Sequence, residues 1–176
     1  MPSIQIMELP EHISIDLLKN WNSDALAISA GAKANIEHNR SYLDNILKQG
    51  GTYYGINTGF GSLCNVGIEP DQLSQLQDNL VCSHACGMGD EVPEEIVRLM
   101  LLLKVHGLSQ GYSGVRMEIV QGLMDLYNSG IYPVVYELGS LGASGDLAPL
   151  AHLSLPLLGK GWVNYKGKKN ERRQRY

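Results

Sequence analysis

Apolar residues recur along this chain with helical spacing, and short breaks rich in glycine or proline separate the segments. Residues 29–49 place their apolar side chains roughly on one side of a helix, and the pair of glycines that follows is expected to end it. Pro70 and Asp71 are expected to open a second helix, which carries an apolar stripe and ends near Gly87. The pattern therefore predicts two helices in the first half of the chain.

Two further helices are expected in the middle of the chain. Pro93 and the two glutamates after it form a strong helix start, because proline suits the first turn and carboxylates suit the positive end of the helix dipole. The helix that follows, to about Ser109, is apolar on nearly every side, which predicts burial in a bundle or at a subunit interface. Ser113 is expected to cap the next helix, whose apolar stripe reaches residue 126.

Short extended segments interrupt the helical pattern. Thr52–Tyr54 is rich in residues that favour strands, and residues 132–137 form a second extended piece. Asp146 is expected to cap a last helix that reaches about Leu158. The fold class predicted from these segments is mainly α with a few short strands.

Composition narrows the class of protein. The chain has 176 residues, of which 44% are hydrophobic and 18% charged, enough for a globular domain with a core. The body is acidic, while six of the 14 basic residues fall between positions 166 and 175, so no nucleic-acid surface is expected. The sequence shows neither a secretion signal nor an apolar run that could span a membrane. Three cysteines indicate a reducing compartment, so the expected location is cytoplasmic.

The densest chemical signal lies in the glycine-rich residues 139–147. Ser144 stands between Ala143 and Gly145, which invites the interpretation of a nucleophile elbow. The elbow pattern G-x-S-x-G requires a second glycine at position 146, but that position is Asp146. The residues alone favour a flexible loop capped by Asp146, and they leave the purpose of the glycine cluster open.

Three stretches resemble one known family. Residues 139–152 (GSLGASGDLAPLAH) resemble the prosthetic-group segment of the aromatic amino acid ammonia-lyases, and most closely that of the histidine-specific members. Residues 54–61 (YGINTGFG) resemble the tyrosine loop of the family, and residues 80–87 (LVCSHACG) resemble its substrate-selectivity segment. The three stretches occur in the family's order. The resemblance implies the N-terminal portion of a helical-bundle enzyme of the ammonia-lyase and fumarase type.

The resemblance gives residues 143–145 a specific role. In this family the amide nitrogen of the glycine attacks the alanine carbonyl with loss of water, and the serine then eliminates its hydroxyl as a second water. The product is a 4-methylidene-imidazol-5-one (MIO) ring, an electrophile made from backbone, and no external cofactor is needed. By this resemblance Ala143, Ser144 and Gly145 are catalytic, since Gly145 permits the close approach and Ser144 supplies the leaving hydroxyl.

The other two stretches supply the remaining candidates. Tyr54 matches the residue that takes the β proton of the substrate, a task that requires a phenol more acidic than its usual pKa of about 10. By the same resemblance His84, Ser83 and Gly61 are expected to bind the substrate. Ser83 and His84 match a serine-histidine pair whose histidine faces the imidazole of a histidine substrate, and Gly61 is the last glycine of the tyrosine loop. Tyr53 is interpreted as structural. An isolated histidine would be interpreted as locally hydrogen-bonded, so the selectivity role of His84 rests on its register with the other motifs.

Metal binding is not expected. Cys82 and Cys86 share one helix face, but His84 points roughly 200° away from them, so the three side chains cannot converge on zinc. The two cysteines are expected to fill the core. His152 is expected to be a satisfied core or interface residue.

The expected reaction is the elimination of ammonia from L-histidine to give urocanate, in a homotetramer when the family's full length is present. A lyase or aminomutase acting on phenylalanine or tyrosine is the alternative within the class. The alternative from another class is a catalytically silent fragment that only associates with intact subunits. Because the family's later active-site residues are absent, the chain alone is expected to be a poor enzyme or none.

Three regions are expected along the chain. Residues 1–113 form an N-terminal domain with the tyrosine loop and the selectivity helix, and residues 114–167 begin the central helical domain with the tripeptide. Residues 168–176 form a basic tail that no longer resembles the family beyond Lys169. This tail is expected to be disordered or translated off-frame.

Overall fold

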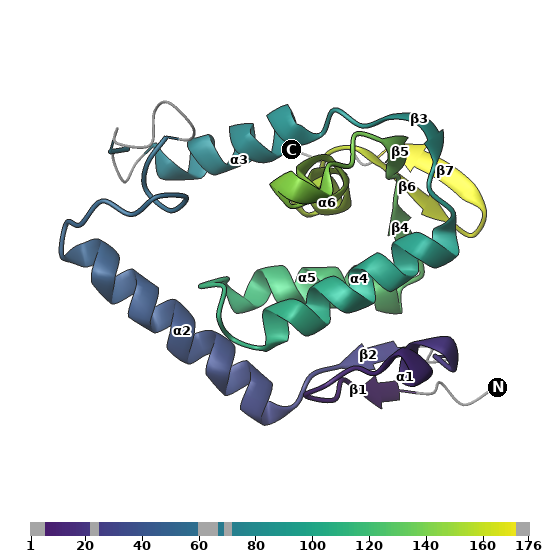
Figure 1. Ribbon diagram of the computed structural model, residues 1–176, viewed down its shortest axis with the longest axis horizontal. Coiled ribbons are helices and arrows are strands. Elements are labelled where there is room, and N and C mark those ends of the chain that lie inside the picture. Colours follow the sequence, from purple (N-terminus) through teal and green to yellow (C-terminus); the bar gives the residue numbers. More distant parts are fainter. Residues whose placement is uncertain (1–5, 22–24, 60–66, 69–71, 172–176) are drawn as a thin grey trace.

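The computed structural model describes residues 6–21, 25–59, 67–68 and 72–171. Within these residues the chain is mainly helical, and its strands are only three or four residues long (Figure 1). The predicted fold class is therefore confirmed.

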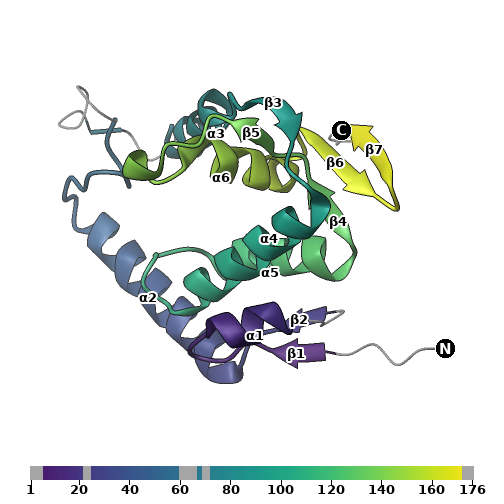
Figure 2. The same ribbon diagram turned by 45° about the vertical axis from the view of Figure 1, so that its right-hand side comes forward.

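Two helices form the centre of the molecule. Helix α4 (Glu94–Ser109) and helix α5 (Met117–Asn128) lie side by side in both views (Figures 1 and 2). Helix α4 begins directly after Pro93, as predicted. The facing sides of the pair supply most of the core, which buries these residues: Val97, Leu101, Leu102, Val105, Val120, Leu123, Met124 and Tyr127.

The N-terminal segment packs against this pair as a small parallel unit. Strand β1 (Ile6–Glu8) pairs with strand β2 (Ala25–Ala27), and helix α1 (Ile15–Lys19) lies between them in the sequence. Strand β2 is fastened to α5 by one side chain: Asn128 Nδ2 donates to the Leu26 carbonyl at 3.1 Å, and its Oδ1 accepts from Leu26 N at 2.7 Å.

Helix α2 (Ala30–Lys48) confirms the first predicted helix and diverges from the central pair (Figure 1). Ser29 caps it by accepting a hydrogen bond from Ala32 N at 3.0 Å. The strand expected over Thr52–Tyr54 is wrong. These residues lead into a turn over residues 54–56, because the side chain of Asn57 holds this stretch in a closed loop.

Helix α3 (Leu73–His84) confirms the second predicted helix, although its expected start at residues 70–71 lies outside the described residues. Its end is three residues earlier than predicted, at His84. Strand β3 (Met88–Glu91) follows and pairs antiparallel with β5 (Tyr136–Leu138).

The start of helix α5 corrects a prediction. Its N-cap is Arg116, so Ser113 does not cap it. The reason is that the preceding loop is tied to α2: Gly114 N donates to Asn39 Oδ1 at 2.6 Å, and Arg40 Nη1 donates to the Gly114 carbonyl at 3.2 Å. These bonds hold residue 114 in the left-handed region, and the helix begins only after the loop has turned.

The last third of the chain contains one helix and a small sheet. Strand β4 (Ile131–Pro133) pairs with β6 (Trp162–Tyr165), which in turn pairs with β7 (Lys168–Glu171). Strands β4 and β5 confirm the extended segment expected at residues 132–137. A 3-10 turn, η2 (Gly142–Ser144), precedes helix α6 (Leu147–Ser154), and a second one, η3 (Leu155–Leu158), completes the stretch predicted to be helical.

The basic tail is partly ordered. Residues 168–171 form strand β7, which corrects the expectation of disorder for these four residues, and residues 172–176 lie outside the described residues. Buried side chains from both sides of residue 113 form a single core cluster. The division into domains at that residue stays a prediction.

Candidate functional site

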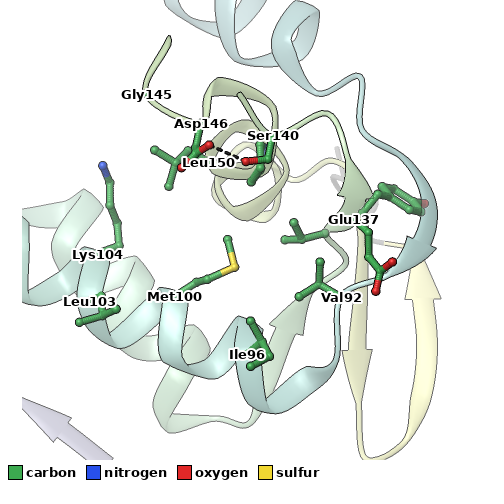
Figure 3. Close-up of a pocket in the computed structure, with 13 residues that line it drawn as sticks. Val92, Ile96, Met100, Leu103, Lys104, Glu137, Ser140, Gly145, Asp146 and Leu150 are labelled. Carbon is green, nitrogen blue, oxygen red and sulfur yellow. Dashed lines mark hydrogen bonds between the residues drawn. The ribbon is translucent and has the colours of Figure 1, made fainter. Parts of the chain in front are cut away.

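The tripeptide of residues 143–145 lies in a tight turn at the start of α6. The backbone N–H of Gly145 donates to the Gly142 carbonyl at 3.1 Å, and Gly145 adopts a left-handed conformation with φ 85°. Asp146 follows at φ 55°, an uncommon conformation for a residue with a side chain. Its carboxylate Oδ1 accepts a hydrogen bond from Ser140 Oγ at 2.5 Å (Figure 3). The Ser140–Asp146 bond therefore closes the loop around the tripeptide. Asp146 stands at the N-cap position of α6, as predicted, but its carboxylate makes no capping bond to the helix.

The base of this loop depends on two glycines that touch. Gly139 has φ 126°, and a Cβ built on it would lie 3.1 Å from the Cα of Gly87 and 3.3 Å from the Cβ of Ala148. A side chain at position 139 would therefore push the segment before β3 away from β5 and α6. The close approach places the residues after α3 directly beside the loop that carries the tripeptide.

Tyr54 stands at the tip of a turn that Asn57 builds. The Asn57 side chain donates to the Gly51 carbonyl and accepts from Tyr53 N, each at 2.8 Å. Gly55 takes a left-handed conformation with φ 76°, which completes the turn. Because the backbone is fixed on both sides, the side chain of Tyr54 is presented outward and is 64% exposed.

His84 ends helix α3 with its ring orientation set by the preceding helical turn. Its Nδ1 lies 2.7 Å from the Leu80 carbonyl and 3.3 Å from Ser83 Oγ. Because a carbonyl can only accept, Nδ1 carries the proton, and in the neutral ring Nε2 is then the acceptor. Ser83 is exposed, and its hydroxyl donates to the same Leu80 carbonyl at 2.9 Å. The structure therefore places the Ser83 hydroxyl beside the His84 ring.

Tyr54 and His84 line one cavity, called the tyrosine–histidine cavity below. It has a volume of about 530 Å³ and lies between the tyrosine turn, α3 and α6. Its walls are mostly apolar and consist of Leu80, Val81, Leu147, Leu150, Ala151 and Ser154 together with Tyr54 and His84. Tyr54 and His84, which are thirty residues apart in the sequence, therefore line the same cavity beside α6.

Gly145, the last residue of the tripeptide, lines a different cavity on the other side of α6. Gly145, Ser140 and Asp146 line a space of about 580 Å³ whose opposite wall is α4 (Figure 3). Lys104 extends from α4 towards the side where Gly145 and Asp146 lie, and Met100 points into the middle (Figure 3). Leu150 of α6 lines both spaces. The structure thus brings Tyr54 and His84 together and places Gly145, the last residue of the tripeptide, in the wall of the other cavity. Gly61 lies outside the described residues.

Two cysteine positions correct the prediction of a core role. Cys86 is exposed and Cys82 is half-buried, with Lys160 Nζ donating to its Sγ at 3.2 Å. Among the described residues, no three histidine, cysteine or acidic side chains gather as they would around a metal ion. In the same part of the chain, no helix combines the length and the apolar character needed to cross a bilayer.

His152 makes a contact near the site that the sequence did not predict. Its Nε2 accepts a hydrogen bond from Gly87 N at 3.0 Å, and its ring meets that of Tyr136 edge-on with 5.1 Å between centroids. Partial burial lowers the pKa of His152 below its usual value. His152 was expected to be hydrogen-bonded, and its Nε2 is. The sequence did not indicate that Gly87 would be the donor.

Comparisons with known proteins support the resemblance. A family model described as aromatic amino acid lyase matches residues 14–175, which corrects the expectation that the sequence leaves the family after Lys169. The histidine ammonia-lyase of Idiomarina loihiensis is 48% identical over 161 residues, covering 90% of this chain and 32% of that protein. The histidine ammonia-lyase of Legionella pneumophila is 51% identical over 151 residues, covering 86% of this chain and 29% of that protein.

Solved structures agree with these relatives. Histidine ammonia-lyase from Trypanosoma cruzi superposes with a TM-score of 0.78 and 38% identity, over 89% of this chain and 30% of that one. Phenylalanine aminomutase from Pantoea agglomerans superposes with a TM-score of 0.85 and 26% identity, over 95% of this chain and 32% of that one. The chain thus spans about a third of the length of the proteins it matches. By sequence and by fold, it belongs to the aromatic amino acid lyase family.

Proposed function

We propose that this chain carries part of the site of an ammonia-lyase that converts L-histidine to urocanate and ammonia. The observation that carries the proposal is the meeting of Tyr54 and His84 in one mostly apolar cavity. Family membership and about 50% identity to histidine ammonia-lyases support the reaction class. A cavity of this kind suits a small ligand whose orientation is fixed by a few polar groups.

His84 is proposed to recognise the substrate ring. Since its Nδ1 donates to the Leu80 carbonyl, its Nε2 can accept a hydrogen bond from the imidazole N–H of a bound histidine. Ser83 is proposed to help orient His84, because its hydroxyl reaches Nδ1 and the same carbonyl. The role of Gly61 in substrate binding stays a prediction.

Tyr54 is proposed to take the β proton of the substrate. Its turn holds the phenol at the rim of the tyrosine–histidine cavity, where a ligand bound to His84 would lie within its reach. Removal of a weakly acidic β proton needs a base close to the reacting carbon. The Asn57 side chain that closes the turn would then fix the position of this base.

Residues 143–145 are proposed to form the MIO group. The fit rests on backbone conformation: the turn brings Gly145 N back to within 3.1 Å of the carbonyl before Ala143, and Gly145 adopts φ 85°, which glycine reaches without strain. Ring closure joins Gly145 N to the Ala143 carbonyl carbon with loss of one water, and loss of the Ser144 hydroxyl releases a second. When present, the group supplies an electrophile that ordinary side chains lack.

Ligand binding tests the proposal directly. Addition of L-histidine to the isotopically labelled chain should shift the ring resonances of His84 and Tyr54, and His84→Leu should abolish the shift. Ser154→Ala, at the opposite wall of the same cavity, is the matched control and should retain binding. If L-histidine leaves both rings unperturbed in the unmodified chain, the proposed substrate is wrong.

A panel of amino acids tests the alternative within the class. The superposition on phenylalanine aminomutase and the apolar cavity walls favour phenylalanine or tyrosine as the second candidate substrate. Binding of L-histidine, L-phenylalanine and L-tyrosine to the chain is compared through the ring resonances of His84 and Tyr54. Preference for L-histidine supports the first proposal, and preference for an aromatic substrate supports the alternative.

Intact mass separates these proposals from a silent fragment. A chain with the MIO group is lighter than the encoded sequence by two waters, whereas an unmodified mass favours a non-catalytic role. We expect little or no turnover from the chain alone. A homotetrameric assembly and a cytoplasmic location remain predictions and are tested by solution mass and by fractionation.

A further inference from the structure

We propose that His152 is a positioning residue that fixes where His84 stands relative to helix α6, the helix that follows the tripeptide. The inference rests on the proposed function, because it assigns His84 to the substrate. It concerns a contact outside both cavities, between Nε2 of His152 and the backbone N–H of Gly87 at 3.0 Å. Gly87 lies only three residues after His84.

The connection between His84 and Gly87 is short and internally bonded. Ala85 N donates to the Val81 carbonyl at 3.2 Å, and Cys86 N donates to the His84 carbonyl at 2.8 Å. The backbone from α3 to Gly87 is therefore a continuation of hydrogen-bonded turns. A displacement of Gly87 should move His84 as well, because both residues between them, Ala85 and Cys86, are held by backbone hydrogen bonds.

Gly87 is enclosed on three sides. A Cβ built on it would lie 3.1 Å from Cδ2 and Nε2 of His152 and 3.3 Å from the Cβ of Tyr136, while Gly139 approaches its Cα from the third side. Gly87 therefore has little room to shift, and its hydrogen bond to His152 fixes where Gly87 lies along α6. The edge-on contact with Tyr136 holds the His152 ring in that orientation.

The neighbours of His152 on α6 reach the substrate side. Ala151 and Ser154 line the tyrosine–histidine cavity with His84, whereas His152 is not part of its wall. Residues 151 and 154 share a helix face, and residue 152 points about 100° away from residue 151. The helix thus presents one face to the ligand and uses the next to hold the segment that follows His84.

The contact needs a neutral His152. An acceptor Nε2 requires the ring proton on Nδ1, and a second proton removes the acceptor and repels the Gly87 N–H. Tyr136 of β5 faces the ring, and beyond it Lys169 of β7 lies 5.9 Å from the tyrosine ring and is ion-paired with Glu91 of β3.

The titratable groups on α3, which packs against α6, and on the connection after it are Asp78, Cys82, His84 and Cys86. Burial of the His152 ring favours the neutral form, so the contact persists near neutrality and is lost in acid. Substrate recognition by His84 should therefore weaken as His152 gains a proton.

Two substitutions separate positioning from packing. His152→Gln keeps an acceptor near the Nε2 position but does not titrate, and His152→Phe keeps a ring against Tyr136 but removes the acceptor. His38→Gln, at an exposed site on α2, controls for general effects of losing a histidine. Hydrogen exchange of the Gly87 amide and the ring resonances of His84 are measured in each protein, with and without L-histidine, between about pH 5 and 7.5.

In His152→Phe we expect faster exchange at Gly87, shifted His84 ring resonances, and L-histidine binding weaker by about tenfold, the scale of one hydrogen bond. In His152→Gln we expect Gly87 protection and L-histidine binding near those of the unmodified chain at neutral pH, and Gly87 protection that no longer declines in acid. His38→Gln should change none of these.

Unchanged Gly87 exchange or unchanged His84 resonances in His152→Phe would overturn the proposal, as would a decline of Gly87 protection in acid that persists in His152→Gln. If the proposed function is wrong, the result is different: the unmodified chain binds no L-histidine at any pH. The Gly87 and His84 resonances still decide the positioning role in that case, because they need no ligand.

Discussion

Helices α4 and α5 on one side, and helices α3 and α6 on the other, are held in place by different means. Helix α4 buries six of its residues and α5 buries five, whereas α6 buries three and α3 none. The first pair is fixed by apolar contact over its whole length. The segment that joins α3 to β3 is held against α6 by two touching glycines, a histidine acceptor and hydrogen-bonded turns.

The difference has a consequence for the candidate site. Apolar packing tolerates replacement by residues of similar volume, while a single directional contact is lost with one atom. Residues that set the site should therefore respond to small chemical changes, and residues of the core should respond to lost volume. Four measurements test this contrast.

The largest effect is expected at the core of the central pair. Leu101 of α4 is fully buried, so Leu101→Ala should lower the free energy of unfolding by about 2–5 kcal/mol. Leu103→Ala on the same helix is the matched control, because that side chain is 42% exposed, and it should cost less than about 1 kcal/mol. Urea denaturation of both variants gives the values, and equal losses would show that α4 is not packed as described.

The next effect is expected at the glycine contact beneath the tripeptide. Gly139→Ala places a Cβ 3.1 Å from the Gly87 Cα at φ 126°, which should cost about 1–3 kcal/mol and shift the Gly87 resonance. Gly142→Ala in the same loop adds a methyl into open space and should change little. Thermal unfolding and an amide spectrum measure both, and a neutral Gly139→Ala would contradict the close approach.

A smaller effect is expected from the titration of His152. Burial lowers its folded pKa below the usual value of about 6.5, so the unfolded chain takes up a proton first as pH falls. The free energy of unfolding should therefore decrease as pH drops below about 6.5 and level off below the folded pKa. His152→Gln should remove this part of the decline, which urea denaturation at several pH values detects; a decline of the same size in the variant would count against it.

The smallest effect is expected at the hairpin of β6 and β7. Lys169 pairs with Glu91 and lies over Trp162 at 5.5 Å, but both charged groups are largely exposed to solvent. Solvent screening limits the pair, so Lys169→Met should cost no more than about 1 kcal/mol and less in high salt.

The acid dependence of that pair has a defined direction. The hydrogen bond from Lys169 lowers the pKa of Glu91, so the contribution is present above about pH 4.5 and is lost as pH falls through the lowered pKa. Unfolding of Lys169→Met at several salt concentrations and pH values checks both dependences. A loss of unfolding free energy as large as that of Leu101→Ala would mean that the hairpin is part of the core.

The parts of the fold that were predictable are those with local signals. Ser29 and Pro93 mark the starts of α2 and α4, because caps and first-turn residues act within one turn of chain. The start of α5 was missed because Asn39 and Arg40, more than seventy residues away, fix the loop before it. Strands β1 and β2 were missed because three-residue strands show no periodicity.

The candidate site was predictable only in part. Motif resemblance named Tyr54 and His84, and the structure brings them to one cavity. The position of Gly145 on the other side of α6 was not predictable, because spacing along the chain does not say which helix face a loop reaches. The bond between His152 and Gly87 joins residues 65 apart and leaves no pattern in either segment.

The bond between Asn128 and strand β2 has a further consequence for how this chain behaves among its own copies. An exposed strand edge offers unpaired amide and carbonyl groups that another polypeptide can extend. The carboxamide of Asn128 occupies both groups of Leu26, as a neighbouring strand would. A helix side chain thus covers the β2 edge of the two-stranded sheet at Leu26 and shields that edge from intermolecular β-pairing.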